Sequence, residues 1–131
     1  MPVRCVIVDD NPYFLRAASA LLERQGVTVV SIASTGAQAY RVCRELQPDV
    51  VLLDVGLGGE TGFDVARGLA QQAGPAGPRV ILTSAYPPDE FEDMIADAPA
   101  VAFMPKAGLS GTAILGVIGW PAGGGPQRDS R

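Results

Sequence analysis

Short apolar runs alternate with helix-like stretches along this chain, and the alternation restricts the fold more than any other feature of the sequence. The five apolar runs have the composition of strands. They span residues 3–8, 27–32, 49–54, 79–84 and 100–104. A stretch with helical spacing of apolar residues follows each run. These stretches cover residues 12–26, 36–46 and 63–72, a segment that starts at Pro88, and residues 109–119. Five strand–helix units predict a doubly wound α/β fold, in which helices cover both faces of a five-stranded parallel sheet.

Local signals mark where several of these elements begin and end. Asn11 is a good N-cap residue, and Pro12 suits the first position of a helix. Gly26 is expected to end that helix. The four middle residues of the run 49–54 are all apolar, as is typical of a strand buried on both faces.

Some residues are predicted to belong to the core. Cys5 and Cys43 are too few for a disulfide framework, and the chain has no histidine that could join them in a zinc site. We therefore interpret both as small core residues. Phe91, Met94 and Ile95, in the fourth helical stretch, are expected in the core as well.

Length and composition indicate one globular domain. The chain has 131 residues, of which 47% are apolar and 18% charged, so it can bury a single core. We expect a domain over residues 1–119 and a disordered tail over the glycine- and proline-rich residues 120–131. No apolar run is long enough to cross a membrane, and the N-terminus lacks the apolar region of a signal peptide, so we expect a cytoplasmic protein. A net charge of −4 without a basic cluster argues against direct binding to nucleic acid.

Polar residues gather at the carboxyl ends of the predicted strands. Asp9 and Asp10 end the first run, and Asp54 ends the third. Ser84 ends the fourth run, and Lys106 follows the fifth. In an open parallel sheet these strand ends form the rim where ligands bind. We therefore expect three carboxylates, a hydroxyl group and an ammonium group to converge on one site.

The charges of this site indicate a missing cation. Three carboxylates and one lysine leave a net charge of about −2, which would push one carboxylate toward protonation. A divalent cation removes that excess, and an all-oxygen ligand set suits Mg²⁺. Metal, hydroxyl and lysine together are what phosphoryl transfer to a carboxylate requires. Asp54, alone at the end of the central strand, is the best-placed nucleophile.

The constellation resembles the receiver domain of two-component response regulators. The resemblance covers residues from 3 to about 119 and rests on "DD" at 9–10, "DVVLLD" ending at Asp54, "ILTSA" with Ser84 and "FMPKA" with Lys106. The spacings agree, with 44 residues from Asp10 to Asp54, 30 from Asp54 to Ser84 and 52 from Asp54 to Lys106. The family implies a flavodoxin-like sheet with strand order 2-1-3-4-5 and five helices.

The resemblance also implies a role for each matching residue. Asp10 would bind the metal directly and Asp9 mainly through water, while Asp54 would be both metal ligand and phosphoacceptor. The backbone carbonyl of Gly56 would complete the protein's ligands, and Ser84 would capture a phosphoryl oxygen. The protein would then be a phosphoacceptor that catalyses its own phosphorylation and dephosphorylation, rather than a conventional enzyme.

A switch and its partners follow from the same resemblance. Lys106 would hold the phosphoryl group together with Ser84, and Phe103 would be the aromatic residue whose rotamer changes on activation. The donor would be a phosphohistidine on a sensor kinase or a phosphotransfer protein, with small acyl phosphates as substitutes. The face made by the fourth helix, fifth strand and fifth helix would change its preference for a downstream effector protein or for a second copy of the chain. Because only residues 120–131 follow the last helix, we expect a single-domain response regulator, and the receiver half of a DNA-binding response regulator is the alternative.

The sequence departs from the family at three places, one of which is Phe103, which lacks a tyrosine hydroxyl and can report activation only by its packing. Gly58 stands where most members have a proline four residues after the acceptor, so the glycine-rich loop 56–62 is expected to be more flexible. Pro105 precedes Lys106 and Ala107 follows it, whereas many members have a proline after the lysine, often with a cis peptide bond.

Other interpretations of these residues compete with the phosphoacceptor. Residues 9–12 alone would make a good helix cap. A phosphohydrolase with an aspartyl-phosphate intermediate would need a second acid two residues after Asp54, where Gly56 stands. An adaptor that accepts no phosphate and a flavin-binding domain are the remaining alternatives. Tyr86 is either a loop aromatic or a lid that keeps water from the acyl phosphate.

Overall fold

The structure is a computed structural model that describes residues 2–120. Its main sheet has five parallel strands in the order β2–β1–β3–β6–β7. The strands are β1 (Arg4–Val8), β2 (Thr28–Ala33), β3 (Val50–Asp54), β6 (Arg79–Ser84) and β7 (Ala102–Pro105). Numbered within this sheet, the order is 2-1-3-4-5, which confirms the predicted doubly wound, flavodoxin-like fold. The predicted tail lies outside the described residues except for Trp120.

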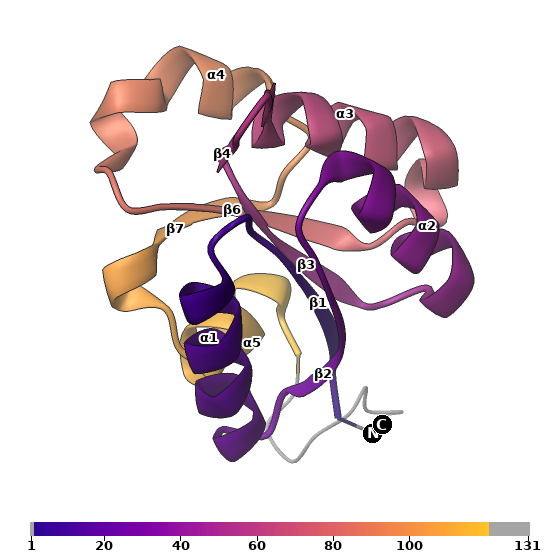
Figure 1. Cartoon of the computed structure of the whole chain (residues 1–131), viewed down its shortest axis with the longest axis vertical. Coiled ribbons are helices and arrows are strands. Elements are labelled where there is room, and N and C mark those ends of the chain that lie inside the picture. The colour runs from indigo at the N-terminus through magenta and orange to yellow at the C-terminus, as the bar shows by residue number, and fades with distance from the viewer. Residues whose placement is uncertain (1, 121–131) are drawn as a thin grey trace.

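Five α-helices of the described chain cover the two faces of the sheet (Figure 1). One face carries α1 (Pro12–Arg24) and α5 (Gly111–Ile118), and the other carries α2 (Gly36–Leu46), α3 (Gly62–Ala73) and α4 (Glu92–Asp97). Three short 3₁₀ segments are η1 (Gly74–Ala76), η2 (Pro88–Phe91) and η3 (Lys106–Gly108). Each face buries its own apolar cluster, one between the sheet and α1 and α5, the other between the sheet and α2 and α3.

The predicted signals account for the central strand and the first helix. All five residues of β3 are buried, as expected for a strand covered on both faces. The Asn11 side chain accepts hydrogen bonds from the backbone N–H groups of Tyr13 and Phe14, so Asn11 caps α1. Cys5 and Cys43 are both buried, which confirms that they belong to the core.

The fourth helical segment differs from the prediction. It begins at Pro88 as the 3₁₀ turn η2, and the α-helical part is only α4. Phe91 and Ile95 pack partly against the core, but Met94 is 54% exposed, so its assignment to the core is wrong. The physical reason is helical phase, because Met94 and Ile95 are adjacent in α4 and therefore point about 100° apart around the helix, so only Ile95 faces the core.

The glycine-rich loop after β3 also differs from the prediction, because it contains regular structure. Strands β4 (Gly56–Leu57) and β5 (Glu60–Thr61) pair antiparallel in a small hairpin. Gly58 lies at its turn with a φ of +70°, a left-handed conformation that favours glycine. The hairpin leads directly into α3, whose N-cap is Thr61.

No helix within residues 2–120 is long and apolar enough to cross a membrane. No cis peptide bond occurs in the same range, so the bonds on either side of Lys106 are trans.

Candidate functional site

Three carboxylates meet at the carboxyl ends of β1 and β3. These strands are neighbours, with Val8 opposite Leu53, so the residues that follow them emerge side by side. One carboxylate oxygen each from Asp9, Asp10 and Asp54 lies within 4.8 Å of the others. Asp9 and Asp54 are buried, whereas Asp10 is exposed. The predicted acidic cluster is therefore present.

Lys106 reaches the cluster from the edge strand β7. It is the first residue of η3, directly after β7, and its Nζ lies 2.7 Å from Asp9 Oδ2 and 3.8 Å from Asp54 Oδ1. Its side chain is largely buried, so these charges interact with little screening by solvent. Four of the residues predicted from the sequence thus form one charged site.

Burial and the charge balance of this site raise the pKa of Asp54. Burial, and next the negative charge of Asp9, raise the pKa of Asp54 from its ordinary value of 3.8 to about 6. The charge of Asp10 adds to this rise. The Lys106 ammonium group and a hydrogen bond with the Gly56 backbone oppose it. Without a further cation, the site is therefore more negative than its surroundings can stabilise.

The residues present fit a divalent metal ion. Asp9 Oδ2 is buried and has no hydrogen-bond partner among the described residues, so the Lys106 ammonium at 2.7 Å is its only close counter-charge there. Three carboxylates against one ammonium leave an excess of about −2. Hard oxygen ligands with that excess suit Mg²⁺. Asp9, Asp10 and Asp54 are the residues that would hold it.

Ser84 lies at the end of β6, next to the strand that ends in Asp54. Asp54 stands opposite Thr83 in the ladder, and Ser84 stands opposite Pro105, the residue before Lys106. Ser84 is buried, and its Oγ accepts a hydrogen bond from the backbone N–H of Tyr86 at 3.0 Å rather than from a residue of the acidic cluster.

The two predicted aromatic switch residues have different environments. Phe103, on β7, is half-buried, and its ring centroid lies 6.4 Å from that of Phe91. Phe91 in turn lies 6.0 Å from Phe63 on α3, so Phe103 belongs to a row of three aromatic rings. Tyr86 is 62% exposed.

Phe14 belongs to the site, although its sequence position predicts only that it lies in the first helix. The Lys106 Nζ lies 4.2 Å from the centroid of its ring, within the range of a cation–π contact. Phe14 is in the first turn of α1, which starts three residues after Asp9 and so lies beside the strand ends. Its place in the sequence, a few residues after Asp9 and Asp10, could have indicated that Phe14 lies near the site. The contact with Lys106 could not be predicted, because the lysine comes from a distant part of the chain.

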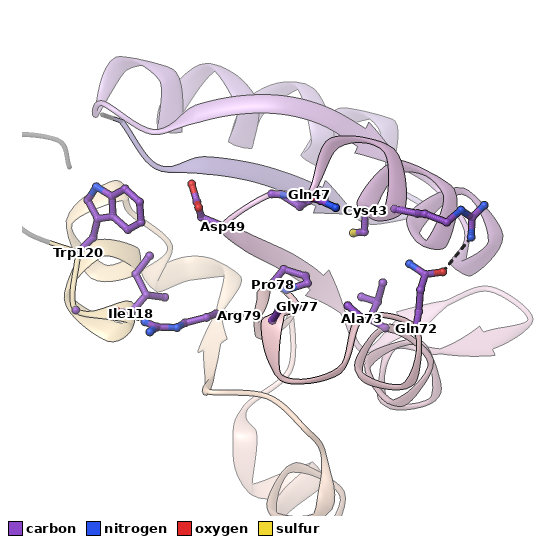
Figure 2. A pocket seen from close by; sticks show the side chains of 15 residues that line it. Cys43, Gln47, Asp49, Gln72, Ala73, Gly77, Pro78, Arg79, Ile118 and Trp120 are labelled. Carbon is purple, nitrogen blue, oxygen red and sulfur yellow. Dashed lines mark hydrogen bonds between the residues drawn. The ribbon is translucent and has the colours of Figure 1, made fainter. Parts of the chain in front are cut away.

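A cavity of about 910 Å³ lies at the opposite end of the sheet (Figure 2). Asp49 precedes β3 and Arg79 begins β6, so the cavity opens at the amino ends of the strands. Its charged side chains already have partners. Asp49 accepts a hydrogen bond from the Arg4 backbone, Arg79 donates to the Ile118 carbonyl, and Arg44 donates to Gln72, as the dashed line in Figure 2 shows. We therefore assign the chemistry to the acidic site and not to this cavity.

Comparison with known proteins agrees with this geometry. The response regulator receiver domain family matches residues 5–111 of the chain. A Pseudomonas aeruginosa protein named as a transcriptional regulator is 32% identical over 127 residues, which cover 92% of this chain and 60% of that protein. The DNA-binding response regulator MtrA of Mycolicibacterium smegmatis is 39% identical over 84 residues, which cover 64% of this chain and 36% of that protein. The crystal structure of a LuxR-family two-component response regulator from Aurantimonas is similar with a TM-score of 0.81 and 28% identity, over 91% of this chain and 86% of that one.

These curated relatives are longer than the chain, which spans 60% of the first and 36% of the second. The family match, in contrast, covers most of the chain. The acidic pocket and Lys106 are typical of the phosphoacceptor sites of that family. By its sequence and its fold, this chain belongs to the response regulator receiver domain family.

Proposed function

We propose that the chain is a signalling switch that accepts a phosphoryl group on Asp54 from a sensor histidine kinase or a phosphotransfer protein. The observation that carries the proposal is the position of Asp54, whose carboxylate lies beside two further carboxylates and 3.8 Å from the Lys106 ammonium group. Phosphoryl transfer needs ligands for a metal ion and a cation that binds the phosphoryl oxygens, and a nucleophile in that position has both beside it. We take residues 1–119 as the unit that carries this activity, and a cytoplasmic location belongs to the same proposal.

In the proposed reaction an Asp54 carboxylate oxygen attacks the phosphorus atom of the donor. The new O–P bond forms as the P–N bond of the phosphohistidine breaks, and the departing imidazole nitrogen takes a proton from water. Lys106 holds one phosphoryl oxygen, and the Ser84 hydroxyl group donates a hydrogen bond to another. Bound Mg²⁺, held by Asp9, Asp10, Asp54 and the Gly56 carbonyl, would neutralise negative charge on the acids and on the phosphoryl group. Dephosphorylation is a separate hydrolysis, in which water attacks the phosphorus atom, the bond between Asp54 and phosphorus breaks, and the Asp54 carboxylate and inorganic phosphate are released.

The output of the switch is proposed for the face made by α4, β7 and α5. When Ser84 turns toward the phosphoryl group, it gives up its hydrogen bond from the Tyr86 backbone, which frees the loop after β6 to move. Phe103 would follow by changing its packing against Phe91. Met94, Val101 and Val117 are exposed on the elements of this face or beside them and offer apolar contacts to an effector protein or to a second copy of the chain.

Mass spectrometry of the intact protein tests the proposal. After incubation with Mg²⁺ and a small acyl phosphate, we expect the wild-type chain to gain one phosphoryl group and Asp54→Asn to gain none. EDTA should abolish the gain. An unmodified wild type would contradict the proposal and favour an adaptor, and steady turnover of phosphate esters would favour a hydrolase.

A further inference from the structure

The hairpin that follows Asp54 is too small to be stable by itself. Each strand has two residues, with Gly56 opposite Thr61 and Leu57 opposite Glu60. Isolated hairpins are marginal even when they are longer. The turn consists of Gly58 and Gly59, so the loop lacks the rigidity that a proline would give it. Contacts outside the hairpin must therefore hold it in place.

Two contacts attach the hairpin to the elements next to it. The Leu57 side chain is buried in the cluster under α2 and α3. The backbone N–H of Gly62 donates to the Val55 carbonyl at 2.8 Å and closes the base of the loop. A Cβ at Gly62 would collide with the Asp54 carbonyl, so the base of the loop lies directly against the acceptor residue.

The third contact joins the hairpin to a helix far away in the sequence. Glu60 Oε2 accepts a hydrogen bond of 2.8 Å from the backbone N–H of Gly36, the first residue of α2. The N-cap Thr35 accepts from Gln38 and leaves the Gly36 N–H to Glu60. A carboxylate at a helix N-terminus is also favoured by the helix dipole. The contact is close, because a Cβ at position 36 would collide with Glu60 Oε1.

We infer that Glu60 is a positioning residue that ties the loop after Asp54 to the N-terminus of α2. The inference rests on the proposed function. Through its pairing with Leu57, the tether holds the adjacent Gly56 backbone beside the Asp54 carboxylate, where the Gly56 carbonyl is expected to bind the metal. The tether would restrict the motion of this loop, as a proline at position 58 would in other receivers.

Three variants separate this role from a loss of stability alone. Glu60→Ala removes the acceptor, whereas Glu60→Gln keeps an oxygen that can accept from Gly36. The control is Glu23→Ala, because Glu23 Oε2 likewise accepts a backbone hydrogen bond, from Val29 at 2.7 Å, but at the amino end of the sheet. Amide hydrogen exchange at Gly62 in the metal-free protein reports on the hairpin without any contribution from phosphorylation. Isothermal titration calorimetry gives the dissociation constant of Mg²⁺, since Trp120 lines the cavity at the far end and is badly placed to report binding.

We expect Glu60→Ala to speed exchange at Gly62 and to raise the Mg²⁺ dissociation constant about tenfold, the low end of what outer contacts of a metal site contribute. Glu60→Gln should restore both values, and Glu23→Ala should change neither. The inference is overturned if Glu60→Ala resembles Glu23→Ala in both measurements, or if Glu60→Gln is as impaired as Glu60→Ala. Failure of the proposed function is distinguishable, because then the wild type itself would not be phosphorylated.

Discussion

At the scale of single residues, the site depends on a carboxylate that its surroundings disfavour. Asp54 is buried beside Asp9, and the ammonium group of Lys106 lies closer to Asp9 than to Asp54. A second cation would stabilise the charged form of a carboxylate in this position. Covalent attachment of a group that the lysine can bind would stabilise the site as well. The same crowding that weakens the metal-free protein therefore favours both metal binding and phosphorylation.

Replacing the crowded charge should stabilise the metal-free protein. We expect Asp54→Asn to raise the free energy of unfolding in EDTA at neutral pH by about 1–2 kcal/mol, because the amide is isosteric and uncharged. Urea denaturation measures the change. Asp10→Asn is the control, since Asp10 is exposed and its charge is better solvated, so the gain there should be smaller. A loss of stability in Asp54→Asn would contradict the charge argument.

Tyr86 offers a second prediction at this scale. Its backbone contacts Ser84, and its exposed ring is free to close over the phosphoryl group as the predicted lid. If it does, Tyr86→Ala should shorten the half-life of the phosphorylated protein, because water reaches the acyl phosphate more easily. Radiolabelled phosphate released over time measures this, with Tyr13→Ala as a control for loss of an exposed tyrosine. Equal half-lives would end the lid hypothesis.

At the scale of elements, the hairpin β4–β5 helps to position the acceptor Asp54. It connects the buried end of β3 to the N-terminus of α3, and its base lies against Asp54. Its glycines are not equivalent. A Cβ at Gly62 would collide with the Asp54 backbone, whereas a Cβ at Gly59 has no heavy atom within 4 Å among its possible contacts.

This difference predicts opposite outcomes for the same substitution. Gly62→Ala should lower the free energy of unfolding by about 1–3 kcal/mol, as overpacking against backbone does, and should slow phosphorylation by displacing Asp54. Gly59→Ala should leave both nearly unchanged. Thermal unfolding and phosphorylation with an acyl phosphate measure the pair. If Gly62→Ala phosphorylates as fast as Gly59→Ala, the base of the hairpin does not position the acceptor.

At the scale of the whole molecule, the site joins the two halves of the sheet. Asp9 follows β1 and Asp54 ends the central strand β3, while Lys106 follows the edge strand β7 and contacts Phe14 on α1. A metal ion bound by Asp9, Asp10 and Asp54 would hold the carboxyl ends of β1 and β3 together. Folding and metal binding should therefore be linked.

The linkage can be measured by denaturation with and without metal. Free Mg²⁺ at about one hundred times its dissociation constant should raise the free energy of unfolding of the wild type by about 2.7 kcal/mol. NaCl at the same ionic strength controls for general screening of the acidic cluster. Asp9→Asn should lose most of the effect. Equal stabilisation by NaCl and Mg²⁺ would mean that no specific metal site forms.

Local chemistry made much of this predictable. The alternation of strand and helix patterns, the cap at Asn11 and the two-sided burial of β3 depend on neighbouring residues, and the structure confirms them. Because parallel strands end at one edge, the meeting of Asp9, Asp54 and Lys106 also followed from the order of the elements. Only the topology of the sheet was needed for that inference.

The amino-acid sequence by itself determined the fold class, the strand order implied by the family resemblance, and the residues of the charged site. The tertiary structure decided which distant groups touch: Phe14 against Lys106, Glu60 against Gly36, and Met94 out of the core. Periodicity and capping report only on residues within a few positions of one another. Phe14 and Lys106 are 92 positions apart, and Gly36 and Glu60 are 24 positions apart. Such contacts depend on how the helices pack against the sheet, which no local sequence pattern predicts.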